Sequence, residues 1–146
     1  MLKDLDPKLN NLVAYPEDFV LPVECIDGSV GFSRLVGAAA FLIVDRMGLV
    51  DQEKHDILEA GYLCEVGKTI VPENILNRNG GLTEDDFTHI HMHPRESVRG
   101  LRSAGYGNET MLELIECHHE NFDGSGYPAS IKGDNIPLEA RILAVA

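Results

Sequence analysis

Five of the six histidines in this sequence lie between residues 89 and 119. His118 and His119 are adjacent and directly precede a glycine-rich stretch, and His93 directly precedes a proline. Imidazole nitrogens are the commonest protein ligands for borderline transition metals. Neighbouring residues on a helix point about 100° apart, so the adjacent pair suits two neighbouring metals better than one. These three histidines are candidate metal ligands, and ordinary buried or surface roles stay open as the alternative.

Two further groups of residues have spacing that could serve chemistry. His89 and His91 alternate with His93, and the simpler interpretation for both is a solvated helix surface. Arg95, Arg99 and Arg102 follow at helical spacing, which puts three cations on one stripe. In an acidic chain such a stripe indicates an anion or phosphate contact, although a solvated face that balances nearby acids is an equal alternative.

The most specific string in the sequence is DGSGYP, at residues 123–128. Two glycines, a serine and a proline within six residues predict a tight and well-positioned turn. A tyrosine inside such a turn offers a ring for stacking or a hydroxyl for hydrogen bonding. The residues of this loop are Asp123, Gly124, Ser125, Gly126, Tyr127 and Pro128.

The overall charge of the chain excludes several classes of partner. The 146 residues include 12 lysines and arginines against 24 aspartates and glutamates, a formal charge of −12. DNA, RNA and anionic membranes require a basic surface, so we expect none of them as a partner. The longest apolar run, residues 35–44, is about half of the ~20 residues that a membrane-spanning helix needs. Three widely spaced cysteines and no signal-peptide core predict reduced thiols in the cytoplasm.

The elements that must position these residues are predicted to be helices. We expect an irregular segment over residues 1–28 and a helical domain over 29–146, an all-α bundle of five or six helices. Ser29 is expected to cap the first helix and Asp51 the second. Pro94 is expected to interrupt a helix that begins after Thr83. The last helix ends on Ala-Val-Ala, so either the protein ends there or further helices follow and complete the bundle.

Taken in order, several strings resemble the HD-GYP family of cyclic di-GMP phosphodiesterases, a branch of the HD superfamily. The resemblance runs from about residue 63 to residue 146, through the strings YLCEVGK, IVPENILNRNGGLTEDDF, HP, HHENFDGSGYP and KGDNIPLEARILAVA. It implies an all-helical bundle with a centre of two or three metals held by histidines and aspartates. In such a centre, water between the metals attacks a phosphodiester bond.

The resemblance also assigns roles to individual residues. His93, His118 and His119 match metal ligands of the family, and Lys68 matches a lysine near the substrate phosphate. Tyr127 belongs to the loop that gives the family its name. The substrate-binding candidates are then Lys68, Arg95, Arg99, Tyr127, Lys132 and Arg141. The catalytic candidates are Lys68 and Glu65.

The sequence departs from the family pattern at its central dyad. Where the family has His-Asp, this chain has Cys64-Glu65, and the histidine of the family's first core helix is replaced by Gly31 or Phe32. The last ligand, an aspartate, would follow Ala146. Glutamate is one methylene longer than aspartate, so a bridge between two metals should be disturbed. Cysteine suits zinc better than iron or manganese.

Three functions follow from this pattern. The favoured one is a degenerate HD-GYP-like signalling domain that binds a cyclic dinucleotide, such as cyclic di-GMP, or a partner protein without phosphodiesterase activity. The second is an active, metal-dependent phosphodiesterase with a rearranged centre of zinc, iron or manganese. The third is a non-catalytic dimerisation or scaffold module, in which apolar surface at the end of the chain promotes a homodimer.

The metal-ligand candidates are His93, His118, His119, Glu65 and Cys64.

Overall fold

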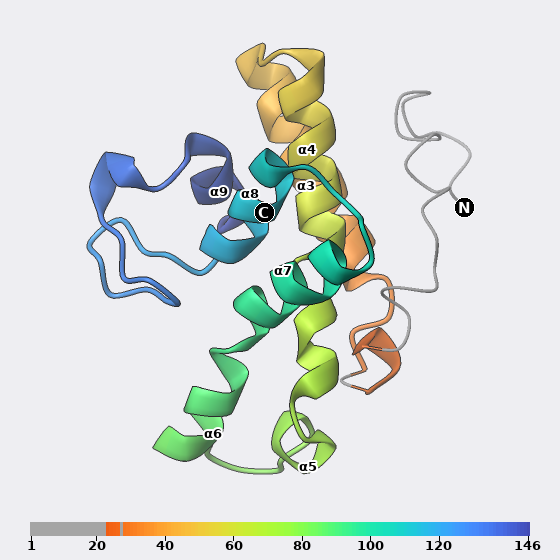
Figure 1. Ribbon diagram of the computed structural model, residues 1–146, viewed down its shortest axis with the longest axis vertical. Helices are drawn as coiled ribbons and strands as arrows, with labels where there is room; N and C mark the ends of the chain where they lie inside the picture. Colours follow the sequence, from red (N-terminus) through yellow and green to blue (C-terminus); the bar gives the residue numbers. More distant parts are fainter. Residues whose placement is uncertain (1–22, 27) are drawn as a thin grey trace.

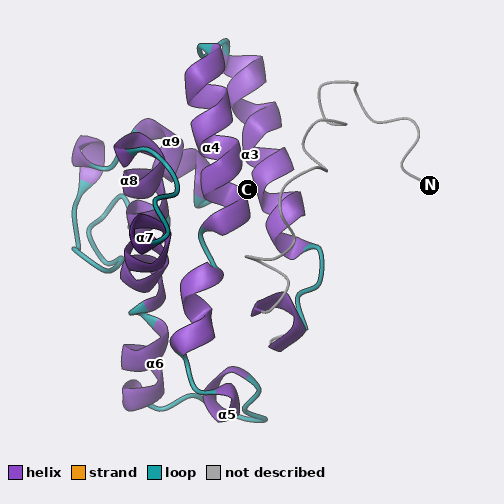
Figure 2. Cartoon of the chain, turned by 45° about the vertical axis from the view of Figure 1, so that its right-hand side comes forward, coloured by secondary structure: helices purple, strands orange, loops and turns teal. Residues whose placement is uncertain are grey.

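The computed structural model describes residues 23–26 and 28–146, and these residues form helices, turns and loops without a strand (Figures 1 and 2). The predicted all-α fold is confirmed. Most of the irregular segment expected over residues 1–28 lies outside the described residues, although 23–26 make a helical turn. The helices are α3 (Phe32–Met47), α4 (Asp51–Leu63), η2 (Val66–Ile70), α5 (Glu73–Leu76), α6 (Glu84–Ile90), α7 (His93–Ser103), α8 (Glu109–Cys117), η3 (Gly133–Asn135) and α9 (Leu138–Leu143).

Helices α3 and α4 form the central antiparallel pair of the fold (Figure 1). They cross at two glycines, because a Cβ on Gly61 would lie 2.7 Å from the Cα of Gly37. This close approach allows apolar side chains on both helices to form one core with α8 and α9. Ala40 and Val44 of α3 and Ile57 of α4 are fully buried in it. The pair therefore supplies a rigid support for the elements that follow it.

The caps of the first two helices differ from the prediction. Helix α3 is capped by Glu24, whose carboxylate accepts hydrogen bonds from the backbone N–H groups of Gly31 and Ser33 at 2.8 and 3.0 Å. Helix α4 begins at Asp51, and the carboxylate of Glu53 accepts from the backbone N–H of Val50. In both cases a glutamate reaches the free N–H groups, so neither Ser29 nor Asp51 serves as the predicted cap.

The break near Pro94 also lies elsewhere than predicted. Helix α6 ends at Ile90 and α7 begins at His93, so Pro94 lies in the first turn of α7. Proline is tolerated there because the first N–H groups of a helix have no partner within the helix. His93 is consequently fixed at the start of a helix rather than left at a kink.

With the short helix α5, the described residues contain seven α-helices, whereas five or six helices were predicted.

After α8 the chain forms a long loop, and α9 then returns to the core (Figure 1). Ala140 and Leu143 of α9 are buried against α3 and α4. None of the helices in the described part of the chain is long and apolar enough to cross a membrane.

Candidate metal centre

Four ligand-capable side chains meet where α4, α7 and α8 come together. Glu65 follows the end of α4, His93 begins α7, and His118 and His119 follow α8. One ligand atom from each of these residues lies within 4.8 Å of all the others. The Glu65 Oε1 atom is 3.8 Å from His93 Nε2, 3.5 Å from His118 Nε2 and 3.9 Å from His119 Nε2. Residues far apart in the sequence thus form one compact group.

The backbone fixes how two of these imidazole rings are protonated. His93 Nδ1 lies 2.7 Å from the carbonyl oxygen of Ile90, and His118 Nδ1 lies 2.6 Å from that of Ile115. A carbonyl oxygen can only accept a hydrogen bond, so each Nδ1 carries the hydrogen and each Nε2 has a free lone pair. These two Nε2 atoms lie 3.3 Å apart. Two facing lone pairs beside a carboxylate fit a bound cation, and such backbone contacts commonly orient histidine ligands.

Burial and charge determine the protonation of this group. Burial alone would raise the pKa of Glu65, but three neighbours lower it below the usual range: a hydrogen bond from His118 and the charge of His93, both of which arise when these rings take up a second proton, and the charge of Lys68. Lys68 forms an ion pair with the second carboxylate oxygen of Glu65. Glu65 is therefore ionised at neutral pH. Three imidazole nitrogens and a carboxylate form a donor set that suits a divalent transition metal.

We expect the metal-free protein to lose stability as the pH falls from 7 to 5. Burial lowers the pKa of His93 to about 4 and that of His119 to about 3, and the neighbouring histidines contribute. An exposed histidine has a pKa of about 6.5, so the unfolded chain takes up protons in this range whereas the folded chain does not. Urea denaturation at the two pH values measures the difference. Equal free energies of unfolding at the two pH values would contradict this expectation. In the His119→Gln variant, the free energy of unfolding should depend less on pH.

The structure does not bring Cys64 into this group. Its side chain is 3% exposed, and its thiol donates to the carbonyl oxygen of Gly61 at 3.5 Å. Burial raises the pKa of the Cys64 thiol well above its usual value, so it stays neutral. The backbone carbonyl of Cys64 instead accepts a hydrogen bond from Ser97 Oγ at 2.7 Å, and Ser97 Oγ accepts from the N–H of Gly67. Cys64 therefore helps to anchor the Glu65 turn to α7 through its backbone.

The DGSGYP loop folds back against the end of α8. Gly126 allows this, because a Cβ there would lie 2.4 Å from the carbonyl oxygen of His119. The Tyr127 ring stacks on His91, with centroids 3.8 Å apart, and on His119, with centroids 4.7 Å apart. At the other end of the loop, Asp123 accepts a hydrogen bond from the N–H of Ser125. The predicted ordered turn is confirmed, and its tyrosine lies against a candidate metal ligand.

The segment after Tyr127 is held by a buried carboxylate. Glu120 is 3% exposed and accepts hydrogen bonds from the N–H groups of Ala129 and Ile131 at 2.7 and 3.1 Å. We expect Glu120→Ala to destabilise the protein by about 1–3 kcal/mol, because two partly buried N–H groups lose the buried carboxylate that accepts from them. Hydrogen exchange should show faster exchange at residues 126–132. The exposed Glu113→Ala is the control, and unchanged exchange in Glu120→Ala would contradict the role given to Glu120.

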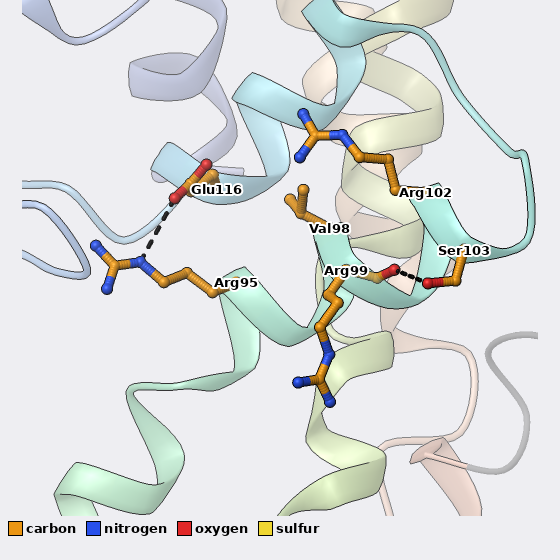
Figure 3. A pocket seen from close by; sticks show the side chains of 6 residues that line it. All are labelled: Arg95, Val98, Arg99, Arg102, Ser103 and Glu116. Atoms are coloured by element: carbon orange, nitrogen blue, oxygen red, sulfur yellow. Dashed lines mark hydrogen bonds and ion pairs between the residues drawn. The ribbon is translucent and has the colours of Figure 1, made fainter.

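The predicted arginine stripe lies along the groove between α7 and α8. A hollow of about 470 Å³ has Val98, Ser103 and Glu116 in its lining together with all three arginines (Figure 3). Each arginine has an acidic partner: Arg95 pairs with Glu116, Arg99 with Glu96 and Arg102 with Glu109. Arg95 also donates to the carbonyl oxygen of Pro128, so it joins the stripe to the loop. The stripe is therefore partly occupied by ion pairs within the chain.

The other two basic candidates contact the loop between α8 and α9, Lys132 from within it and Arg141 from α9. The Lys132 side chain packs over Gly124. Arg141 lies over the Phe122 ring, 5.7 Å from its centroid, and pairs with Asp134 at 3.2 Å. Lys68 is different, since its ammonium group pairs directly with Glu65 at the centre.

Three residues that matter to this arrangement were missed by the sequence interpretation. His91 is exposed as predicted, but its ring is stacked on Tyr127 rather than free in solvent. Ser97 gave no local signal, and the one hint for Glu120 was its position directly after two candidate ligand histidines. Each acts on backbone groups that the tertiary fold brings near.

The fold and the centre together define an HD domain. A family model described as HD domain matches residues 11–146, so this chain belongs to that family. The resemblance to the HD-GYP branch is likewise supported by relatives named cyclic di-GMP phosphodiesterases.

Among individual proteins, the chain is similar to the cyclic di-GMP phosphodiesterase response regulator RpfG of Xanthomonas campestris. The two are 37% identical over 122 residues, which are 82% of this chain and 32% of that protein. A probable cyclic di-GMP phosphodiesterase of Vibrio cholerae is 40% identical over 95 residues, 60% of this chain and 22% of the relative. The 3'3'-cGAMP-specific phosphodiesterase 2 of the same organism is 37% identical over 100 residues, 68% and 19% of the two chains. The chain thus spans about a third or less of each of these relatives.

Proposed function

We propose that this chain is a metal-binding HD-GYP signalling module that recognises a cyclic dinucleotide without hydrolysing it. The observation that carries the proposal is the convergence of Glu65 with three histidines whose Nε2 atoms face its carboxylate. When bound, a divalent ion of iron, manganese or zinc would supply positive charge for a phosphate oxygen. The relatives named as acting on cyclic di-GMP and cGAMP support this class of ligand.

The donor set supports one metal rather than two. Two-metal phosphodiesterases hold ions about 3.5–4 Å apart, one on the attacking oxygen and one on the leaving oxygen. The group in the described part of the chain offers four ligand residues, and Cys64 points away from it. Four donors are enough to hold a single ion. The replacement of the family's His-Asp by Cys64-Glu65 thus supports binding of a nucleotide in preference to its cleavage by two metals.

The surroundings of the centre support recognition of a nucleotide. Lys68 places an ammonium group beside Glu65, where it can contact a phosphate. A second hollow of about 360 Å³ lies next to the loop, and its lining includes His91, Arg95, Tyr127 and Pro128. Arg95 and an aromatic face in one hollow suit an anionic ligand with a planar base. Arg99 lies further along α7, Lys132 lies on the loop after Tyr127 and Arg141 lies on α9, so these three contribute less.

Hydrolysis is the second candidate, and one observation favours it. The side chain of His119 is 36% exposed, so the four donor atoms are not fully enclosed by protein. A catalytic metal site needs such an open position for water or substrate. The same residues that bind a dinucleotide could therefore cleave it slowly.

Metal analysis and calorimetry test the proposal on the full chain. Protein purified without a histidine tag or chelators is analysed for metal and titrated with cyclic di-GMP and with 3'3'-cGAMP. The mixtures are then incubated and chromatographed. We expect about one transition-metal ion per chain, heat of binding with at least one dinucleotide and no linear product.

Other outcomes distinguish the candidates. A linear product would move hydrolysis to first place, and two ions per chain would contradict the one-metal centre. Folded protein that gives no heat at high micromolar dinucleotide would contradict the proposed ligand. Lys68→Ala should weaken dinucleotide binding at least about 10-fold, the loss expected when a charged hydrogen bond of about 1.5 kcal/mol or more is removed. Lys132→Ala is the matched control and should bind almost as the wild type does.

A further inference from the structure

The three histidines of the centre are not held in the same way. His93 donates a hydrogen bond from Nδ1 to the carbonyl oxygen of Ile90 at the end of α6, and His118 donates from Nδ1 to that of Ile115 in α8. His119 makes no such hydrogen bond among the residues that the structure describes. Its side chain is also the most exposed of the three, at 36%. An imidazole without an outer partner can rotate, which lowers its value as a metal ligand.

Ring stacking takes the place of the missing hydrogen bond. The Tyr127 ring lies against His119 at an interplanar angle of 27° with centroids 4.7 Å apart. His91 stacks on Tyr127 at 15° and 3.8 Å. No ring contact joins His91 directly to His119 in the described part of the chain, so Tyr127 lies between them. The order of rings is therefore His91, Tyr127, His119.

The three rings come from three separate elements. His91 follows α6, His119 follows α8, and Tyr127 belongs to the loop. The backbone N–H of Tyr127 donates to the carbonyl oxygen of His119 at 3.2 Å. Stacked aromatic pairs of this kind add stability beyond that of the area that they bury. His91 closes the stack from the side opposite the metal centre. Without it, one face of Tyr127 has no ring to hold it.

We infer that His91 is a positioning residue for the metal centre. Acting through Tyr127, it holds the His119 imidazole in the orientation in which Nε2 faces the Glu65 carboxylate. This inference rests on the proposed metal site, but it concerns a residue that is not one of the four ligand candidates. It also explains why an exposed histidine has an ordered ring partner.

The test compares two substitutions of His91 in the full chain. Affinity for Zn²⁺ is measured by competition with a chromophoric chelator for the wild type, His91→Ala and His91→Phe. We expect His91→Ala to bind about 10-fold more weakly, the lower end of the loss seen when an outer partner of a metal ligand is removed. His91→Phe should bind nearly as well as the wild type, because phenylalanine keeps the ring. Since phenylalanine cannot ligate a metal, this rescue excludes direct ligation by His91.

A matched control and a metal-free measurement complete the test. His89→Ala changes a partly exposed histidine of α6 whose ring does not stack on Tyr127 among the described residues, and it should leave the affinity unchanged. In metal-free protein, the NMR resonances of the His119 ring should shift in His91→Ala and return in His91→Phe. Wild-type protein that binds no Zn²⁺ would contradict the proposed metal site, whereas the metal-free spectra would still decide whether His91 orients His119. Unchanged affinity together with unchanged His119 resonances would overturn the inference. If His91→Ala were poorly folded, Tyr127→Leu should give the same weakening.

Discussion

Glu65→Gln is expected to reduce the affinity for Zn²⁺ by at least about 100-fold. Loss of residues that merely orient a metal ligand already costs about 10–100-fold, and Glu65 is itself a candidate ligand. Its carboxylate lies within 4 Å of three imidazole Nε2 atoms, so its charge acts on all of them. Glutamine keeps nearly the same shape and removes the charge. Competition with a chelator measures the affinity.

The control for this substitution is Glu113→Gln on the exposed face of α8. It removes the same charge from the chain without touching the centre, so it corrects for the general effect of an acidic protein on a cation. Circular dichroism should show both variants folded. A Glu65→Gln protein that binds Zn²⁺ as the wild type does would exclude Glu65 as a ligand.

Among substitutions that add a single methyl group at the centre, Gly67→Ala should reduce the stability of the protein the most. A Cβ at Gly67 would lie 2.1 Å from the carbonyl oxygen of His93 and 2.5 Å from the backbone N of Ser97. Backbone atoms cannot move aside as side chains do, so the turn that carries Glu65 must separate from α7. Overpacking of this kind typically costs about 1–3 kcal/mol, and we expect a loss at or above 3 kcal/mol. Chemical denaturation measures the free energy of unfolding.

Gly100→Ala is the matched control, because Gly100 lies on α7 and a Cβ there meets no atom within 4 Å. Alanine is favoured over glycine inside a helix by about 0.5–1 kcal/mol, so this variant should be more stable than the wild type. If Gly67→Ala were as stable as Gly100→Ala, the close contact between the Glu65 turn and α7 would be disproved. Metal affinity should fall in Gly67→Ala and stay unchanged in Gly100→Ala.

Much of this fold could be predicted because helix periodicity is a local property. Gly48 ends α3 and Asn108 caps α8, and both are residue types that mark helix ends by local chemistry. The caps at the first two helices could not be predicted, because Glu24 reaches α3 across seven and nine residues. Such contacts depend on how the chain turns between the two positions.

The candidate site was predicted in part for the same reason. Paired histidines and a His-Pro step are visible in the sequence, and the structure brings them together with Glu65. Cys64 was included because it is adjacent to Glu65 in the sequence. At the end of a helix, the side chains of neighbouring residues point in different directions. The Cys64 side chain is therefore buried in the core, whereas the Glu65 side chain lies at the candidate metal centre.

By itself, the sequence determined the all-helical class, the order of the helices, the identity of most ligand candidates and the acidic character that disfavours nucleic acid. These properties follow from periodicity, residue type and charge, each of which is read over short stretches. Only the tertiary structure decided which side chains share the centre, which nitrogen of each anchored histidine is free, and that His91 stacks on Tyr127. These depend on distances between residues far apart in the sequence. The packing of α8 against α4 and α7, and of α7 against η2, determines those distances.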